Sequence, residues 1–456
     1  MSRHPGWPLT ALLTLYPLWW LLGMGTLIVF VLVLPMVLHL WRRRRIVVPP
    51  GFGLWLLFLA WVVASTAFLG MNPPGTLPDT VSGRIVSVGF NLAGYLSATI
   101  VLLYAGNLSE TEFPRRRLVR HLGGLFVVVV AGGLLGTFAP TFDVTSPVEL
   151  LLPDSVAEDV FVQSLVHPTA AQLHEVLGYQ SPRPSAPFGF TNTWGHCFAL
   201  LLGWFLISHM SAGHTRRRAA GLVVLLLAAI PVVYSLNRGL WLGLGLALGV
   251  AAVRLARRGR FAVITGLVAA LSLTAVLLTA SPLGAMVQAR LDNGHSNDIR
   301  TFTTQRTLEV LAHSPVMGFG STRAALGSSN SIVVGSDADC RRCGNPTLGS
   351  NGQVWLLLIA QGIGGTALYV GFLLRSLWAY RRDRTPIGDG GRLVLVLSLA
   401  FMLVYNALTM PLVITFLSIA LMWRQQRDEP ARPAEISRRA PASRPVLLAG
   451  QTRSPA

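Results

Sequence analysis

The feature that most limits the fold is a series of long apolar runs repeated along the chain. The sequence has 456 residues, of which 52% are hydrophobic and 12% charged. A helix needs about 20 mostly apolar residues to cross a bilayer, and a soluble fold needs no such repetition. We therefore predict an all-α polytopic membrane protein with about 12 transmembrane helices. The expected spans are residues 9–23, 25–41, 53–71, 84–106, 122–139, 192–210, 219–235, 240–253, 261–280, 353–374, 392–408 and 411–424.

Two parts of this layout stay open. Only Gly23 and Gly25 separate the first two runs, so residues 9–41 form either two spans or one bent segment. The runs at 240–253 and 411–424 are short for a full crossing. We assign residues 1–424 to one transmembrane domain and expect 425–456, rich in Pro, Arg, Ser and Ala, to be a disordered cytoplasmic tail.

The basic residues indicate how the chain is oriented. The formal net charge is +18, and every basic residue other than histidine is an arginine. Every second connection between apolar runs is basic, which the positive-inside rule assigns to the cytoplasm. These connections are 42–45, 115–120, 216–218, 254–260 and 381–384. We read them as topology signals in a multi-pass protein of the cell membrane, with both termini cytoplasmic, and expect no nucleic acid partner.

Two of the connections expected outside the membrane are long. Residues 140–191 include a stretch, "SVAEDVFVQSLVHPTAAQLHEVLG", whose apolar spacing predicts one or two amphipathic surface helices. Residues 281–352 contain a predicted helix from about Ile299 to Ala312, closed by Pro315 and the glycines after it. Long outer loops over a helical bundle favour a protein that holds something at the outer surface of the membrane.

Several arginines lie on this predicted outer side, against the usual bias. Guanidinium carries five donors in a rigid fork and stays charged, so it suits a phosphate or diphosphate ester. The ordinary alternative is snorkelling toward lipid headgroups. Arg238 is the most constrained, because it sits beside Asn237 in the short gap, residues 236–239, between two apolar runs. The outward arginines are Arg183, Arg238, Arg300, Arg306 and Arg323.

Four pieces of the chain, covering about 180–376, resemble the O-antigen ligase and O-antigen polymerase superfamily of membrane glycosyltransferases. The first two are "SPRPSAPFGFTNTWGHCFALLL", with an Arg-then-Phe-then-Asn approach to a span, and "YSLNRGLWLGL", a Ser-x-x-Arg-Gly hairpin. The third is "QRTLEVLAHSPVMGFG", an arginine-led helix ending in a Pro-x-x-Gly-x-Gly turn. The fourth is "GIGGT", from Gly362 to Thr366.

The resemblance implies a metal-independent, inverting glycosyltransferase of ligase or polymerase type, with no cofactor. It would move a glycan from a polyprenyl diphosphate carrier to a sugar or lipid acceptor at the outer face of the cytoplasmic membrane. By resemblance, Arg183 and Arg238 hold the diphosphate and Arg306 approaches it from the loop. We add Arg300, on the same predicted helix, as a further substrate-binding residue.

One position departs from the family pattern. Ligases of the family carry a histidine where this chain has Asn351, and an amide cannot take up a proton near neutral pH. Three explanations stay open: a polymerase-like enzyme that needs no such base, another residue in its place, or loss of activity. The replacement bases in the same loop are His295, His313, Asp337 and Asp339.

Other motifs are weighed more briefly. Cys340 and Cys343 predict a disulfide in the outer loop rather than a zinc site, because no second cysteine pair follows. The same loop's Asp-x-Asp pair is an unlikely metal site, since nucleotide sugars are not expected outside the cell. We interpret His196 as a packed residue. Two other functions stay open: a transporter or flippase for a lipid-linked glycan or anionic lipid, and a catalytically degenerate family member.

Overall fold

The structure is a computed structural model that describes residues 4–175, 180–210, 215–266, 268–269, 284–285, 287–289, 295–327 and 345–428. The described part is mostly helical, with two short antiparallel hairpins. The helices before residue 150 are α1 (Trp7–Thr14), α2 (Tyr16–Leu21), α3 (Ile28–Trp41), α4 (Phe52–Ser65), the 3-10 turn η1 (Thr66–Phe68), α5 (Val81–Asn107), α6 (Arg115–Phe138) and α7 (Pro147–Leu150). The later ones are α8 (Asp154–Ala157), α9 (Val160–Val166), α10 (Thr191–Met210), α11 (Thr215–Tyr234), α12 (Arg238–Arg257), α15 (His295–Leu311), α16 (Gln353–Ala379), α17 (Pro386–Phe401) and α18 (Met410–Asp428).

Five helices of the described part are long and apolar enough to cross a membrane: α5, α6, α11, α12 and α16. Large apolar side chains on them face outward, such as Leu226 at 65% and Leu242 at 73% exposed, and these would contact lipid. The prediction of a mostly helical membrane protein is thus confirmed. The count of twelve spans stays a prediction, because α3 and α4 are shorter and most of the run 261–280 lies outside the described residues.

The first apolar stretch, residues 9–41, contains three helices, α1, α2 and α3, and whether they make one span or two stays open. Pro17 stands in the first turn of α2, where its missing N–H needs no partner, so the chain restarts a helix there. Gly23 adopts a φ of +77° between α2 and α3. A Cβ at Gly23 would lie 2.5 Å from the carbonyl oxygen of Val166, so this turn requires glycine.

Helices α10 and α18 lie at the centre of the bundle. Every residue of α18 from Met410 to Arg424 is buried, and the helix packs against α5, α10 and α17. Beside it the Trp55 ring of α4 contacts Phe416 of α18 at a centroid distance of 4.8 Å and Tyr95 of α5 at 6.1 Å. Helices far apart in sequence therefore share one apolar core.

The "GIGGT" motif makes a kink in α16. Gly362 has a φ of +64°, and a Cβ there would lie 2.3 Å from the carbonyl oxygen of Val316. The kink frees the carbonyls of Ile359 and Ala360, which accept hydrogen bonds from the amides of Phe319 and Gly320 at 2.8 and 2.7 Å. The motif therefore docks the turn after α15 onto a membrane helix.

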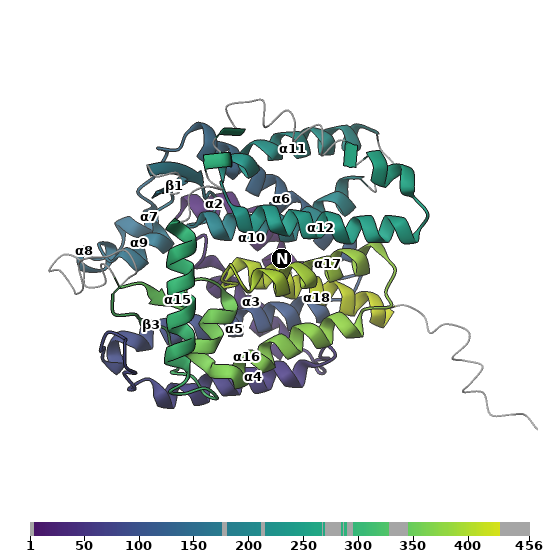
Figure 1. Ribbon diagram of the computed structural model, residues 1–456. Helices are drawn as coiled ribbons and strands as arrows, with labels where there is room; N and C mark the ends of the chain where they lie inside the picture. Colours follow the sequence, from purple (N-terminus) through teal and green to yellow (C-terminus); the bar gives the residue numbers. More distant parts are fainter. Residues whose placement is uncertain are drawn as a thin grey trace, which may run out of the picture.

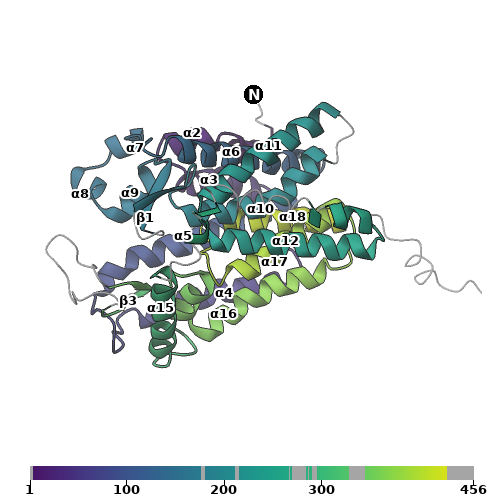
Figure 2. The same ribbon diagram turned by 45° about the horizontal axis from the view of Figure 1, so that its top comes forward.

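The long helices alternate in direction, so their connections gather at two ends. The short elements α7, α8, α9, β1, β3 and α15 lie together at one end of the bundle, at the left in Figures 1 and 2. We call this the loop end. The basic connections contact one another at the other ends of the helices, as in the ion pairs that Asp389 makes with Arg254 and Arg258, both at 3.4 Å. We call this the basic end.

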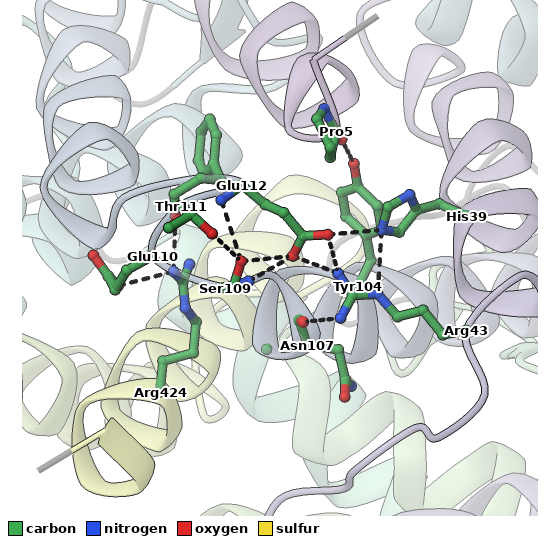
Figure 3. Close-up of polar contacts among 12 residues, drawn as sticks. Pro5, His39, Arg43, Tyr104, Asn107, Ser109, Glu110, Thr111, Glu112 and Arg424 are labelled. Carbon is green, nitrogen blue, oxygen red and sulfur yellow. Dashed lines mark hydrogen bonds and ion pairs between the residues drawn. The ribbon is translucent and has the colours of Figure 1, made fainter. Parts of the chain in front are cut away.

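A polar network fixes the connection between α5 and α6 at the basic end (Figure 3). Glu112 accepts hydrogen bonds from Arg43 at 2.5 Å and from the Ser109 amide at 2.8 Å. Although burial raises it, these hydrogen bonds hold the pKa of Glu112 below its ordinary value of 4.5. Arg424, 0% exposed, reaches the same connection through Glu110 at 2.9 Å.

The segment 140–191 agrees with its prediction only in part: helices α8 and α9 lie in the expected stretch. The expected helical pattern continues only to Val166, where α9 ends, and the chain then forms strand β1 (Ala171–Glu175). Pro168 explains the break, because the residue before a proline is disfavoured in helical geometry and proline has no N–H to donate. Strand β1 pairs with β2 (Gln180–Pro184) in antiparallel register, which places Gln172 opposite Arg183.

The segment 281–352 agrees better with its prediction. Helix α15 runs from His295 to Leu311, four residues earlier than the expected start at Ile299, and Pro315 follows its end. A second hairpin, β3 (Arg323–Ala324) with β4 (Thr347–Leu348), joins the two ends of the loop beyond it. Cys340, Cys343, Asp337 and Asp339 lie outside the described residues, as do 429–456 of the predicted tail.

Candidate functional site

The tight connection between α11 and α12 is built around Asn237. Its side-chain oxygen caps α12 by accepting a hydrogen bond from the Leu240 amide at 3.3 Å, and accepts another from the Tyr405 hydroxyl at 2.5 Å. Tyr405 can approach Asn237 because residue 239, two positions later, is a glycine. A Cβ at Gly239 would lie 2.7 Å from the Tyr405 hydroxyl. Arg238, the first residue of α12, stands between Asn237 and Gly239 in the chain.

Arg183 reaches this connection from strand β2. Its side chain is buried, and its Nε donates a hydrogen bond of 2.7 Å to the carbonyl oxygen of Ser235. The Thr191 hydroxyl, at the start of α10, donates to the carbonyl oxygen of Arg183 at 3.3 Å. The hairpin that the sequence did not predict is therefore the element that positions Arg183.

Arg300 comes to the same place from helix α15. Burial lowers the pKa of its guanidinium, the Tyr405 hydroxyl raises it in part, and the charge of Arg238 lowers it further. Within the described ranges, the Arg300 guanidinium makes no hydrogen bond and no ion pair. A half-buried cation that is short of partners is well placed to bind an anion.

Tyr405 is the common neighbour of these charges. It lies in the connection between α17 and α18, 2% exposed, within electrostatic range of both Arg183 and Arg300. The His196 ring stacks on it at a centroid distance of 5.4 Å and an interplanar angle of 30°. His196 is itself 2% exposed, which agrees with a packed residue. We name Arg183, Arg238 and Arg300 around Tyr405 the arginine cluster.

The side chain of Asn351 contacts helix α15. Its side-chain amide donates to the carbonyl oxygen of Arg300 at 3.2 Å and, in a second and shorter hydrogen bond, to the Thr303 hydroxyl. Both acceptors are on α15, so Asn351 ties the foot of α16 to the helix that carries Arg300. The contact gives Asn351 a positioning role, which is what an amide can supply.

Arg306 lies apart from the cluster. It follows Arg300 by six residues, more than one and a half helical turns, and so points to another side of α15. It pairs with Glu309 at 2.7 Å and lies against Gly75, whose Cβ would be 3.3 Å from the Arg306 guanidinium. None of these contacts reaches Tyr405. The structure therefore brings together Arg183, Arg238 and Arg300, but not Arg306.

Arg323 and His313 make their contacts elsewhere. Arg323 is 2% exposed and donates to backbone carbonyls, among them those of Leu69 and Met71, so it holds the turn after α4. The ring of His313 is close to the carbonyl of Val310 at the end of α15, at 3.3 Å. In the described part of the chain, no three His, Cys, Asp or Glu side chains gather as metal ligands would.

Sequence reasoning missed Tyr405. A signal was present, since Tyr405 and Asn406 are a polar pair near the end of the apolar run 392–408. Such a pair inside a predicted span indicates a buried hydrogen-bonded site.

The arrangement gathers three arginines around Tyr405: Arg183 and Arg300 within electrostatic range of it, and Arg238 within range of Arg300. Fixed cations of this kind bind an anion strongly where water is scarce and can stabilise negative charge that develops during a reaction. No family model matches the sequence, and no curated protein sequence matches it.

Proposed function

We propose that the protein is a membrane glycosyltransferase of ligase or polymerase type, acting in cell-surface polysaccharide assembly. It would move a glycan from a polyprenyl diphosphate carrier to a sugar or lipid acceptor at the outer face of the membrane. The observation that carries the proposal is that Arg183 and Arg300 lie within electrostatic range of Tyr405. Arg238 belongs to the connection that Tyr405 contacts, and its charge acts on Arg300. The order of the four family-like motifs supports it.

The cluster suits the chemistry of such a transfer. The acceptor hydroxyl attacks the anomeric carbon and gives its proton to water, while the bond from that carbon to the diphosphate oxygen breaks. The diphosphate leaves with the electron pair, so negative charge accumulates on it in the transition state. Arginines fixed beside it stabilise that charge without a reorganisation of solvent. Attack from the face opposite the diphosphate inverts the anomeric centre.

In this proposal Arg300 meets the diphosphate most directly, because its guanidinium makes no hydrogen bond within the described residues. Arg183 is already held by the Ser235 carbonyl and so fixes the wall of the site. Asn351 sets the position of Arg300 through α15 and takes up no proton. The histidine expected from the family resemblance is thus replaced by a residue that orients a cation.

The placement of charge along the helices supports an outer location. The cluster is at the loop end, and the basic connections are at the opposite ends of the same helices. The positive-inside rule assigns basic connections to the cytoplasm, and under that rule the cluster would be outside. A carrier with its diphosphate at the outer membrane surface would approach it from the lipid.

The test is complementation of a strain that lacks the gene. Arg300→Ala should abolish surface glycan assembly, and Arg300→Lys should restore part of it, because lysine keeps the charge but loses the fork geometry. Arg382→Ala, at an exposed position of the basic end, is the matched control and should keep normal glycan. Normal glycan in the Arg300→Ala strain would contradict the proposal. Movement of carrier across vesicles without transfer would replace it with a transporter.

A further inference from the structure

A polar cavity lies at the loop end. It has a volume of about 220 Å³ and lies between the first turn of α5, the residues before it, and the β3–β4 hairpin. Figure 1 shows β3 beside α15 at this end of the molecule. The cavity shares no lining residue with the cluster around Tyr405. Its walls carry the side chains of Asp79, Arg84, Ser87, Thr322 and Arg323.

Two buried arginines form one wall. Arg84 is 4% exposed and Arg323 is 2% exposed. Both donate to the carbonyl oxygens of Leu69 and Met71: Arg84 at 2.6 and 3.2 Å, and Arg323 at 3.3 and 3.1 Å. The two guanidinium groups therefore lie side by side on shared acceptors. Carbonyl acceptors satisfy the hydrogen bonds but leave both charges in place.

The electrostatics agree with two neighbouring cations. Burial and the charge of Arg84 lower the pKa of Arg323 to about 10, while Asp79 raises it in part. Among the described lining residues Asp79 is the one acid. Its carboxylate accepts a hydrogen bond from the Thr80 amide, just before α5, at 2.8 Å. Two positive charges thus face one negative charge, and the N-terminus of α5 adds partial positive charge.

A buried excess of positive charge is unfavourable unless an anion neutralises it. Hydroxyl groups of Ser87 and Thr322 line the same space and can bond to polar groups beside that anion. We infer that this cavity binds an anionic group carried together with hydroxyls, either the carboxylate of an acidic sugar or the phosphoglycerol headgroup of a lipid. The inference goes beyond the proposed transfer and does not depend on it.

The experiment is a binding titration on the full-length protein purified in nanodiscs of phosphatidylcholine. D-glucuronate and D-glucose are the two probes, since they differ in one carboxylate. We expect glucuronate to bind at least tenfold more tightly than glucose. Asp79→Asn should strengthen glucuronate binding several-fold and leave glucose unchanged, because it removes the one competing acid among the described lining residues. Equal binding of the two sugars, or no effect of Asp79→Asn, would overturn the inference.

Further variants locate the site and identify the source of the anion. Thr322→Trp should fill the cavity and reduce glucuronate binding at least tenfold. Ser82→Trp is the control, because Ser82 is exposed on the first turn of α5 and does not line the cavity, and it should leave binding unchanged. Full binding by Thr322→Trp would contradict the location. If nanodiscs of phosphatidylglycerol suppress glucuronate binding, the native anion is a headgroup; if they do not, it is a sugar. Arg300→Ala should keep glucuronate binding, which separates this site from the transfer reaction.

Discussion

Arg183 donates its Nε–H to the carbonyl oxygen of Ser235 at 2.7 Å, across 52 residues of sequence. The hydrogen bond joins the hairpin β1–β2 to the connection that carries Asn237 and Arg238. Two motifs that are separate in the sequence therefore form one surface. The position of Arg238 depends on a strand that precedes it by two helices.

The first prediction concerns Arg183. Arg183→Lys keeps a positive charge but loses the Nε donor, so the connection at Ser235 loses its anchor. We expect glycan transfer by the purified enzyme to fall about 10²-fold, because a misplacement of about 1 Å in the residues that position a substrate can cost that much. Arg218→Lys, at the basic end, serves as the control. Unchanged transfer by Arg183→Lys would show that the hydrogen bond is not needed.

The second prediction concerns the cap of α12. Asn237→Ala removes the acceptor of both the Leu240 amide and the Tyr405 hydroxyl. The loss of a helix cap costs about 1 kcal/mol, so thermal unfolding in detergent should shift downward and transfer should decrease. Tyr405→Phe removes one of the two hydrogen bonds and leaves the cap, so its unfolding temperature should fall less. A larger fall in unfolding temperature for Tyr405→Phe than for Asn237→Ala would exclude the capping role of Asn237.

The third prediction concerns Asn351 and its partner Thr303. If Asn351 positions α15, Asn351→Ala and Thr303→Val remove the same hydrogen bond. Their effects on transfer should be non-additive, with the double variant no worse than the poorer single one. A general base would act differently: Asn351→Ala would lower kcat and change the pH profile, with no coupling to Thr303. A pH profile of the wild type and both variants separates the two roles.

The fourth prediction concerns Glu112 at the basic end. Its pKa is lowered in the folded protein, so its contribution to stability is full above the ordinary pKa of 4.5 and is lost as the pH falls through the lowered value. Glu112→Gln should therefore lower the unfolding temperature at pH 7, and the difference from wild type should shrink below about pH 4.5. Glu158→Gln, at an exposed position, should show no such pH dependence. A difference that grows in acid would contradict the assigned hydrogen bonds.

Much of the helical layout can be predicted from the sequence, because apolar runs need helices in a membrane whatever their neighbours do. Helix α15 can be predicted for a different reason: Pro315 and the glycines after it mark where the helix must end. The hairpin β1–β2 was missed because the chain before it has a helical apolar spacing up to Val166. A single proline, Pro168, ends that helix, and the following residues form a strand.

The site itself could be predicted only in part. The outward arginines stand out against the positive-inside bias, and three of them meet. Which side of α15 faces Tyr405 is decided by packing, and this selects Arg300 over Arg306 although both are on one helix. Tyr405 belongs to the site through a hydrogen bond across 168 residues, which no local pattern indicates.

The most direct test of the account is the binding of polyprenyl diphosphate to the purified protein and to two variants of α15. We expect Arg300→Ala to weaken binding at least tenfold, because its guanidinium points to the cluster. Arg306→Ala, on another side of the same helix, should bind the lipid as the wild type does. Full binding by Arg300→Ala, or a loss confined to Arg306→Ala, would contradict a diphosphate site formed by Arg183, Arg238 and Arg300.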